Sequence, residues 1–146
     1  MYHNKQTMKD QLHISEQVCF PVYAFAKEII NQYRPLLEAL ELTYPQYLVM
    51  LVLWEYKEQT VNQLGDKLKL DSGTLTPLLK RMETKAFVTR IRSTVDERIV
   101  NISLTEKGVA LKEKAACIPQ QLMEAMNVSA EDLLLLKNII TKIAKK

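Results

Sequence analysis

The sequence predicts a mainly α-helical protein, a winged helix-turn-helix whose terminal helices form a dimerisation region. Three observations support this fold class. Apolar residues recur at helical spacing through most of the 146 residues. Two short amphipathic helices, separated by a tight break, are expected between residues 60 and 87. Two segments of alternating polarity follow them directly, as the strands of a wing would.

The composition indicates a folded protein. Hydrophobic residues make up 47% of the chain and charged residues 25%, so a packed core is expected. No apolar run approaches the roughly 18 residues that a membrane span needs. The polar N-terminus, residues 1–17, lacks the apolar core of a secretion signal. We therefore expect a cytoplasmic protein with no membrane partner.

The charge pattern is more informative than the net charge of +3. Residues 74–92 carry five cations against one anion, an excess that suits a phosphate backbone but is also typical of a solvated helix face. The cysteines Cys19 and Cys117 form no CxxC pair, and His3 and His13 have no metal-site spacing to them. We expect neither a metal nor a cofactor.

The first helical segment covers residues 12–40, where apolar side chains recur at helical spacing. Pro21 and Pro35 interrupt this segment and should kink or divide it, because proline lacks the backbone N–H that a helix interior needs.

The next two helices have clear start signals. Thr43 is expected to cap a helix with Pro45 in its first turn, and residues 46–56 are apolar enough to be buried on most sides. Thr60 then opens a shorter helix over residues 61–70.

A second short helix and a wing follow. Asp71 or Ser72 is expected to cap a helix over residues 73–87. The residues expected on its buried face are Leu75, Leu78, Leu79 and Met82. Residues 88–92 and 99–104 alternate apolar with polar side chains around a charged hairpin tip. A basic helix followed by a two-stranded wing is the pattern of a winged helix.

The C-terminal part is again helical. Thr105 is expected to cap a helix that runs to about Met126 with a kink at Pro119, and Ser129 begins a final apolar helix. These helices are more hydrophobic than a lone winged helix needs. We expect them to pair with a second subunit, since symmetric DNA readers bind two half-sites; an internal core is the alternative.

The expected organisation is a single domain with two regions. Residues 1–42 and 105–146 form the helical dimerisation region, and residues 43–104 form the DNA-binding lobe.

Particular strings resemble a known family. LTYPQYLVMLVLWE at residues 42–55, LDSGTLTPLLKRME at 70–83 and DERIVNISLTEKG at 96–108 closely resemble the MarR family. Within it, these strings and EQVCFPVYAFAKEIINQYRPLLEAL at 16–40 are most similar to the organic hydroperoxide resistance regulators.

The resemblance implies a homodimeric repressor that binds a pseudo-palindromic operator in double-stranded DNA. It implies release of that operator when an organic hydroperoxide oxidises a cysteine, which falls on Cys19. The tyrosines that surround this cysteine fall on Tyr33 and Tyr44, with Tyr23 nearby. The DNA-binding positions of the recognition helix and wing fall on Ser72, Thr74, Thr76, Lys80, Arg81, Asp96 and Arg98.

Each of these sites has a plainer alternative. A cysteine on an apolar helix is commonly a small buried hydrophobe, and Tyr33 and Tyr44 would then be core aromatics. If the helix restarts at Pro21, however, Cys19 lies beside free N–H groups, which favour the thiolate that attacks a peroxide. The branch usually has an aliphatic residue where Pro21 stands.

Cys117 does not match the family's second, resolving cysteine, which falls nearer residues 127–128. We expect a structural role for Cys117 and a one-cysteine sensor. Its sulfenate is then trapped by a low-molecular-weight thiol, such as glutathione or bacillithiol, or is over-oxidised.

Arg98 has two interpretations. Most hairpin arginines are solvated charges, but Asp96 and Glu97 beside it argue for a positioned side chain that enters a narrow minor groove.

Two other functions remain open from the sequence. A thiol peroxidase would need turnover and cations around the cysteine, yet the nearest, Lys27 and Arg34, form no obvious clamp. A MarR-type repressor could instead bind a phenolic or aromatic ligand noncovalently.

Overall fold

The computed structural model describes residues 11–145; residues 1–10, with His3, and Lys146 lie outside the described residues. The elements follow in the order η1 (Ile14–Glu16), α2 (Cys19–Glu38), α3 (Tyr44–Tyr56), β1 (Glu58–Thr60), α4 (Val61–Leu68), α5 (Ser72–Thr84), β2 (Val88–Arg92), β3 (Val100–Leu104), α6 (Glu106–Ala115), α7 (Ile118–Met126) and α8 (Ala130–Ala144).

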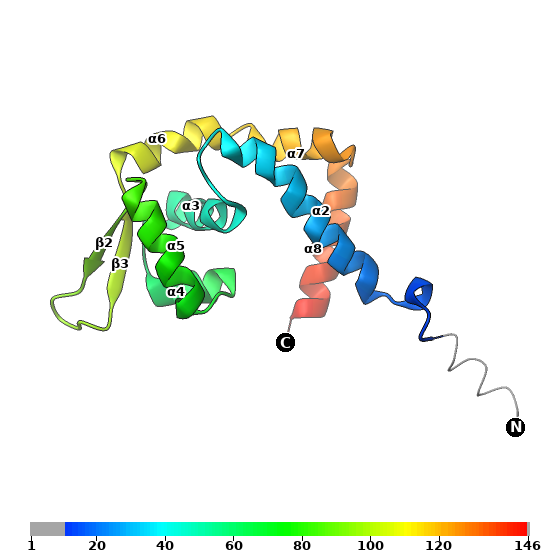
Figure 1. Cartoon of the computed structure of the whole chain (residues 1–146), viewed down its shortest axis with the longest axis horizontal. Helices are drawn as coiled ribbons and strands as arrows, with labels where there is room; N and C mark the ends of the chain where they lie inside the picture. The colour runs from blue at the N-terminus through cyan, green and yellow to red at the C-terminus, as the bar shows by residue number, and fades with distance from the viewer. Residues whose placement is uncertain (1–10, 146) are drawn as a thin grey trace, which may run out of the picture.

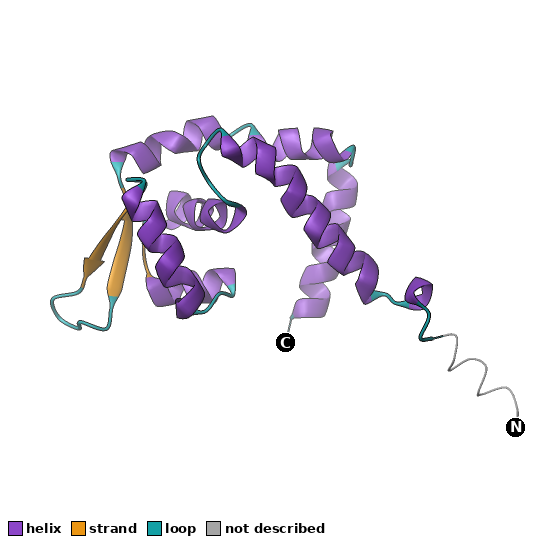
Figure 2. Cartoon of the chain, viewed as in Figure 1, coloured by secondary structure: helices purple, strands orange, loops and turns teal. Residues whose placement is uncertain are grey.

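These elements form a winged helix-turn-helix with long helices beside it. We call the helices α2, α7 and α8 the arms, and α6 connects them to the lobe. α3, α4, α5 and the small sheet make a lobe, and the β2–β3 hairpin projects from its far side (Figure 1). α6 and α7 run along the top, and α2 and α8 lie on the side away from the wing (Figure 2). Within residues 11–145, none of the helices combines the length and apolar character that crossing a membrane requires.

The predicted caps of α3 and α4 are confirmed. The Thr43 side chain accepts the Gln46 N–H while the Gln46 side chain accepts the Thr43 N–H, and Pro45 lies in the first turn. Thr60 and Gln63 make the same reciprocal pair at 3.1 and 2.9 Å. These local bonds define where each helix begins.

α5 begins at the other predicted cap. Asp71 accepts the Thr74 N–H at 2.7 Å, which lowers the pKa of that carboxyl. The predicted inner face is confirmed, since Leu75, Leu78, Leu79 and Met82 are all buried. The helix ends at Thr84, earlier than expected, because Lys85 and the left-handed Ala86 (φ 61°) turn the chain into β2.

One core holds the lobe and the arms together. α3 contributes buried residues on most of its faces, as predicted, although Leu51 is 40% exposed. Leu37 of α2 and Ile118 of α7 join the same cluster as α5 and the sheet. The arms are therefore anchored to the lobe where they meet it.

The sheet has three antiparallel strands in the order β1-β3-β2, so the prediction of a two-stranded wing was incomplete. β2 and β3 pair with Val88 opposite Leu104 and Arg92 opposite Val100. β1 pairs with the edge of β3 that faces away from β2, with Glu58 opposite Ser103. A strand of three residues has no periodicity to detect, and its pairing is made with residues far along the chain.

Pro21 and Pro35 were expected to kink or divide a helical segment over residues 12–40. The segment is divided ahead of Pro21, where only the short η1 forms before α2 begins, but Pro35 does not divide it. α2 runs without a break from Cys19 to Glu38 with Pro35 inside it. Pro21 lies in the first turn, where its missing N–H would have had no partner in the helix. Pro35 removes only one hydrogen bond near the C-terminal end, and packing of Leu37 in the core offsets that loss.

The expected helix from Thr105 to Met126 is instead two helices, α6 and α7, separated at Ala116 and Cys117. Pro119 breaks the helix and does not merely kink it. Proline has no N–H to donate to the Ala115 carbonyl, and its ring clashes with the preceding turn of a continuous helix.

α6 meets the sheet through a close backbone contact at Gly108. A Cβ at this position would lie 2.2 Å from the Phe87 carbonyl oxygen and 3.1 Å from the Leu104 side chain. The Gly108 N–H donates to the Thr105 hydroxyl, and its carbonyl accepts the Trp54 indole N–H at 2.9 Å. We call this meeting of Trp54, Phe87, Thr105 and Gly108 the α6 joint.

We predict that Gly108→Ala destabilises the protein by about 1–3 kcal/mol, because the added methyl group overpacks against backbone that cannot move aside. Helix propensity alone predicts the opposite effect, an increase of about 1 kcal/mol in the free energy of unfolding when alanine replaces glycine inside a helix. Urea unfolding followed by circular dichroism measures the difference. An unchanged or increased free energy of unfolding would show that the joint tolerates a side chain.

Candidate functional site

The outer face of α5 carries polar side chains opposite its buried leucines. Ser72 and Thr74 are exposed in the first turn, and Thr76 is half-buried one turn on. Lys80 and Arg81 are exposed further along the helix. At the N-terminal end of α5 the Asp71 carboxylate accepts the Thr74 N–H, and the side chains of Ser72 and Thr74 are exposed beside it.

A hollow of about 400 Å³ separates the start of α5 from the wing. Ser72 and Thr76 line one side, and three arginines, Arg90, Arg92 and Arg98, line the other. The fold thus brings three of the predicted DNA-binding residues to one concave basic surface. We call this surface the basic hollow.

Arg90 and Arg92 were missing from the predicted site, although the local excess of cations was a signal for both. The Arg90 guanidinium lies 3.8 Å from the Glu83 carboxylate, and its buried Nε has no partner among the described residues. Arg92 donates to the Glu97 carbonyl at 2.7 Å. Arg90 is therefore held by α5, and Arg92 is held by the wing.

Arg98 at the wing tip makes a bidentate hydrogen-bonded contact with Asp96. Arg98 Nε and Nη2 donate to the two carboxylate oxygens of Asp96 at 3.1 and 3.2 Å. The Arg98 side chain is nevertheless 89% exposed, and it holds the pKa of Asp96 below its usual value. Asp96 thus orients a guanidinium whose outer edge stays free for a ligand.

Cys19 is the first residue of α2 and is exposed. The sequence alternative of a buried small hydrophobe is therefore wrong for the single chain. α2 begins two residues before Pro21, so Cys19 lies in the first turn of the helix. The backbone N–H groups of a first turn have no partner within the helix, as expected from the sequence for a helix that starts near Pro21. Tyr23 lies one turn further and is 62% exposed, with the Lys27 ammonium 5.3 Å from its ring centroid.

Tyr33 and Tyr44 meet, but not around Cys19. Their ring centroids are 4.7 Å apart, and both rings are half-buried. Cys19 and Tyr33 stand at opposite ends of one straight run of α2, which at 1.5 Å per residue separates them by roughly 21 Å. One chain therefore does not bring the predicted cysteine and its tyrosines together.

A third tyrosine completes the aromatic cluster and was missed. Tyr47 is buried, and its ring centroid lies 5.8 Å from that of Tyr33 and 6.5 Å from that of Trp54. Its position one turn after Tyr44 was the available signal. Burial, and then the neighbouring Tyr44 and Tyr47, raise the pKa of Tyr33 to about 12, so its hydroxyl keeps its proton and can donate a hydrogen bond.

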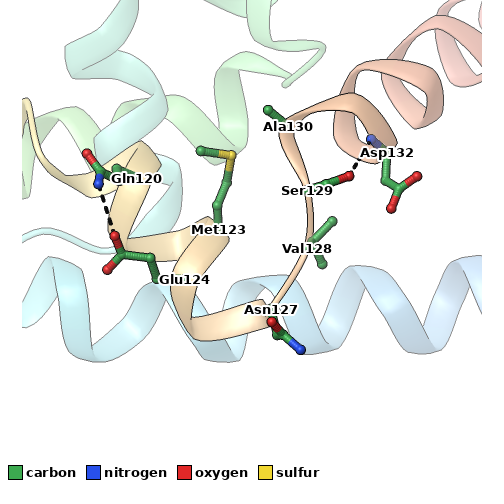
Figure 3. A pocket seen from close by; sticks show the side chains of 8 residues that line it. All are labelled: Gln120, Met123, Glu124, Asn127, Val128, Ser129, Ala130 and Asp132. Atoms are coloured by element: carbon green, nitrogen blue, oxygen red, sulfur yellow. Dashed lines mark hydrogen bonds between the residues drawn. The ribbon is translucent and has the colours of Figure 1, made fainter.

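The second cysteine lies at the break between α6 and α7. Cys117 is exposed, and its thiol donates weakly to the Lys114 carbonyl at 3.6 Å. The elbow between α7 and α8, where a resolving cysteine was considered, holds Asn127 and Val128 beside an open hollow of about 750 Å³ (Figure 3). Figure 3 marks two hydrogen bonds here, the Ser129 cap that accepts the Asp132 N–H and a side-chain pair within α7 in which Gln120 donates to Glu124.

Two helices leave apolar side chains uncovered. α8, Ala130–Ala144, has no buried residue. Its exposed apolar residues are Leu134, Leu135, Ile139, Ile140 and Ile143. The first part of α2 is similar, with Phe20 47% and Val22 60% exposed. Contiguous apolar faces of this extent are characteristic of an interaction surface.

The chain is similar to known transcriptional regulators along most of its length. A family model described as transcriptional regulator SarA/Rot matches residues 31–115. The organic hydroperoxide resistance transcriptional regulator of Bacillus subtilis is 51% identical over 131 residues, which cover 90% of this chain and 89% of that protein. The HTH-type transcriptional regulator SarZ of Staphylococcus aureus is 40% identical over 134 residues, covering 89% of this chain and 90% of SarZ.

The fold also matches a solved regulator, AbfR of Staphylococcus epidermidis. Reduced AbfR bound to DNA gives a TM-score of 0.77 at 31% identity, covering 94% of this chain and 96% of that chain. Disulfide-formed AbfR gives a lower TM-score of 0.63 at 32% identity, covering 96% and 98%. Overoxidised AbfR bound to DNA gives a TM-score of 0.75 at 32% identity, covering 93% and 96%, so the present fold is more similar to the two DNA-bound forms than to the disulfide form.

We predict that the free energy of unfolding falls as pH rises from about 10 toward 12. The unfolded chain loses the Tyr33 proton near pH 10.0, whereas the folded chain keeps it to about 12, so folding becomes less favourable between these values. Tyr33→Phe should flatten part of this fall, and a tyrosinate absorbance titration should lose its most alkaline component. Identical titrations of the two proteins would contradict the burial of this hydroxyl.

Proposed function

The chain belongs to the organic hydroperoxide resistance regulators of the MarR family, and on this premise we propose that it is a dimeric repressor that releases its operator when Cys19 is oxidised. The observation that carries the DNA-binding half is the basic hollow, where the polar start of α5 faces three arginines. As a reader of bacterial DNA, the protein would act in the cytoplasm.

DNA binding would use both sides of the basic hollow. The polar start of α5, with Ser72, Thr74 and Thr76, enters the major groove, and Lys80 and Arg81 contact phosphates beyond it. Arg98, oriented by Asp96, enters the adjacent minor groove. Arg90 and Arg92 then lie between the two grooves, where the phosphate backbone passes.

Dimerisation would cover the apolar faces of α2 and α8. Residues 1–42 and 105–146 form the dimerisation region in this proposal, and residues 43–104 form the DNA-binding lobe. Two-fold pairing of these arms presents two recognition helices to the half-sites of a pseudo-palindromic operator. The uncovered side chains of α8 support a second copy as the partner, because a lone chain exposes them to water.

The sensor would be assembled from both subunits. Because α2 holds Cys19 roughly 21 Å from Tyr33, a thiolate that accepts hydrogen bonds from these hydroxyls must meet the partner subunit's Tyr33 and Tyr44. The raised pKa of Tyr33, about 12, keeps its hydroxyl a donor at neutral pH. Tyr23, one turn from Cys19, flanks the thiol on its own helix.

The chemistry is a two-electron oxidation of sulfur. The Cys19 thiolate attacks the terminal oxygen of an organic hydroperoxide, the O–O bond breaks, and the departing alkoxide takes a proton to become an alcohol. The sulfenic acid so formed condenses with a low-molecular-weight thiol, giving a mixed disulfide and water. One equivalent of peroxide is consumed for each subunit, so the protein acts as a sensor and not as an enzyme.

Release of DNA would follow from repacking of the arms. An adduct on Cys19 lies between apolar helices of two subunits and changes how they pack. The α6 joint links those arms to the wing and to α5. A change in the separation of the two recognition helices is poorly tolerated by half-sites about one helical turn apart.

We predict that Arg98→Ala weakens operator binding by about 1–3 kcal/mol, the range for a specific contact. The matched control is Lys114→Ala, an exposed cation on α6 outside the basic hollow, which should leave affinity nearly unchanged. Fluorescence anisotropy at one fixed salt concentration measures both. Equal affinities of wild type and Arg98→Ala would refute a role for the wing tip.

We predict that Cys19→Ser binds the operator with the affinity of the reduced wild type and no longer responds to cumene hydroperoxide. Cys117→Ser serves as the control and should keep its response. Gel shifts with and without peroxide test both variants, and intact mass spectrometry with added thiol should find one mixed disulfide per subunit. A Cys19–Cys117 disulfide, or catalytic consumption of peroxide, would overturn the one-cysteine sensor.

A further inference from the structure

A separate hollow of about 380 Å³ lies where the DNA-binding lobe meets α6, and it shares no lining residue with the basic hollow. It is formed by the end of α3, by β1 and β3, and by the middle of α6. Val109 and Lys112 of α6 are its only lining residues within the proposed dimerisation region, and none belongs to α2 or α8, whose exposed apolar faces are proposed to pair. We call it the α3–α6 hollow. Its volume is within the range of small-molecule sites.

The floor of the α3–α6 hollow is apolar. Its apolar lining residues are Leu53, Trp54, Leu104 and Val109. The Trp54 indole is half-buried and cannot swing away, because its N–H donates to the Gly108 carbonyl at 2.9 Å. On its other side Trp54 meets the buried Tyr47 edge-on. The hollow therefore has one rigid aromatic wall and several aliphatic ones.

The rim of the α3–α6 hollow carries an excess of positive charge. Lys57 and Lys112 provide two ammonium groups, and Glu58 is the one carboxylate among the lining residues. The Ser103 hydroxyl, 3.2 Å from a carboxylate oxygen of Glu58, already binds that group. The lysines make no ion pair within 4.0 Å among the described residues, so both are available to an anion.

The backbone at Lys57 is strained. This residue has φ 66° and ψ −63°, a conformation that side chains other than glycine rarely adopt. Its N–H donates to the Leu53 carbonyl at 2.8 Å, which holds the strained turn at the end of α3. Glycine would relieve the strain but would remove the ammonium group from the rim. Strain of this kind is commonly kept at binding sites.

We propose that the α3–α6 hollow is a binding site for a small amphipathic carboxylate. The alkyl body lies on Leu53, Trp54 and Val109, and the carboxylate lies between the Lys57 and Lys112 ammonium groups. A neutral ligand of the same shape leaves the ammonium groups without a counter-charge, and a cation is repelled by them. The site is independent of Cys19, so its occupation needs no oxidation.

The experiment uses Trp54, the only tryptophan in the chain, as its reporter. The reduced wild-type protein, without peroxide, is titrated with octanoate, 1-octanol and octylamine while indole fluorescence is followed. We expect a saturable change with octanoate, and affinities for the alcohol and the amine at least about fivefold lower, since two lysines contribute. No saturable change, or an alcohol or amine that binds as tightly as octanoate, would overturn the proposal.

Matched variants locate the carboxylate. Lys57→Gly combined with Lys112→Gln removes both ammonium groups while relieving the strained turn, and should weaken octanoate binding at least about fivefold. Lys114→Gln, two residues along α6 and outside the hollow, should stay within about twofold of wild type. Val109→Glu, at a 57% exposed position, places a like charge beside the ligand and should also weaken binding. Octanoate affinity unchanged in both pocket variants would place the ligand elsewhere.

Discussion

The contact between α6 and the sheet is the constraint on which the rest of the structure depends. Gly108 lets α6 approach the Phe87 backbone more closely than any side chain would permit. Trp54 and Thr105 then lock the approach with hydrogen bonds. Because α6 continues toward α7 and α8, this joint sets the direction of the arm relative to the wing and α5. In the proposed function, a chemical event in the arms must change the DNA-binding lobe, and this requires such a stiff connection.

The length of α2 imposes the second constraint. A helix is stiff on this scale, so a cysteine at its first residue and a tyrosine fourteen residues later cannot meet in one subunit. In the proposed function, the half-buried Tyr33–Tyr44 pair therefore gives each chain only part of the sensor. If two copies complete it, oxidation acts at the interface that also sets the spacing of the recognition helices. Sensing and DNA release would then share one surface.

The helix-turn-helix and the wing could be predicted from local patterns, whereas the individual DNA-binding residues were assigned by resemblance to the family. Ser72, Thr76 and Arg98 line one hollow as a helix-turn-helix with a wing requires. Arg90 and Arg92 were missed as individual contacts, since an alternating strand does not reveal which side chains face α5. Tyr33 and Tyr44 were also assigned by resemblance, and Tyr47 was missed, because the cluster comes from two helices whose packing angle no local pattern specifies.

The sequence by itself determined the features that depend on neighbours three or four residues apart. These are the caps at Thr43, Thr60 and Asp71, the buried face of α5 and the charged wing tip. Only the tertiary structure decided that β1 joins the sheet, since Glu58 pairs with Ser103, 45 residues away. It likewise decided that α2 runs through Pro35, because core packing outweighs one lost hydrogen bond. The tertiary structure also decided that Cys19 lies far from Tyr33 and Tyr44 within one chain. This distance follows from the continuous helix α2 and not from the types of residue in it.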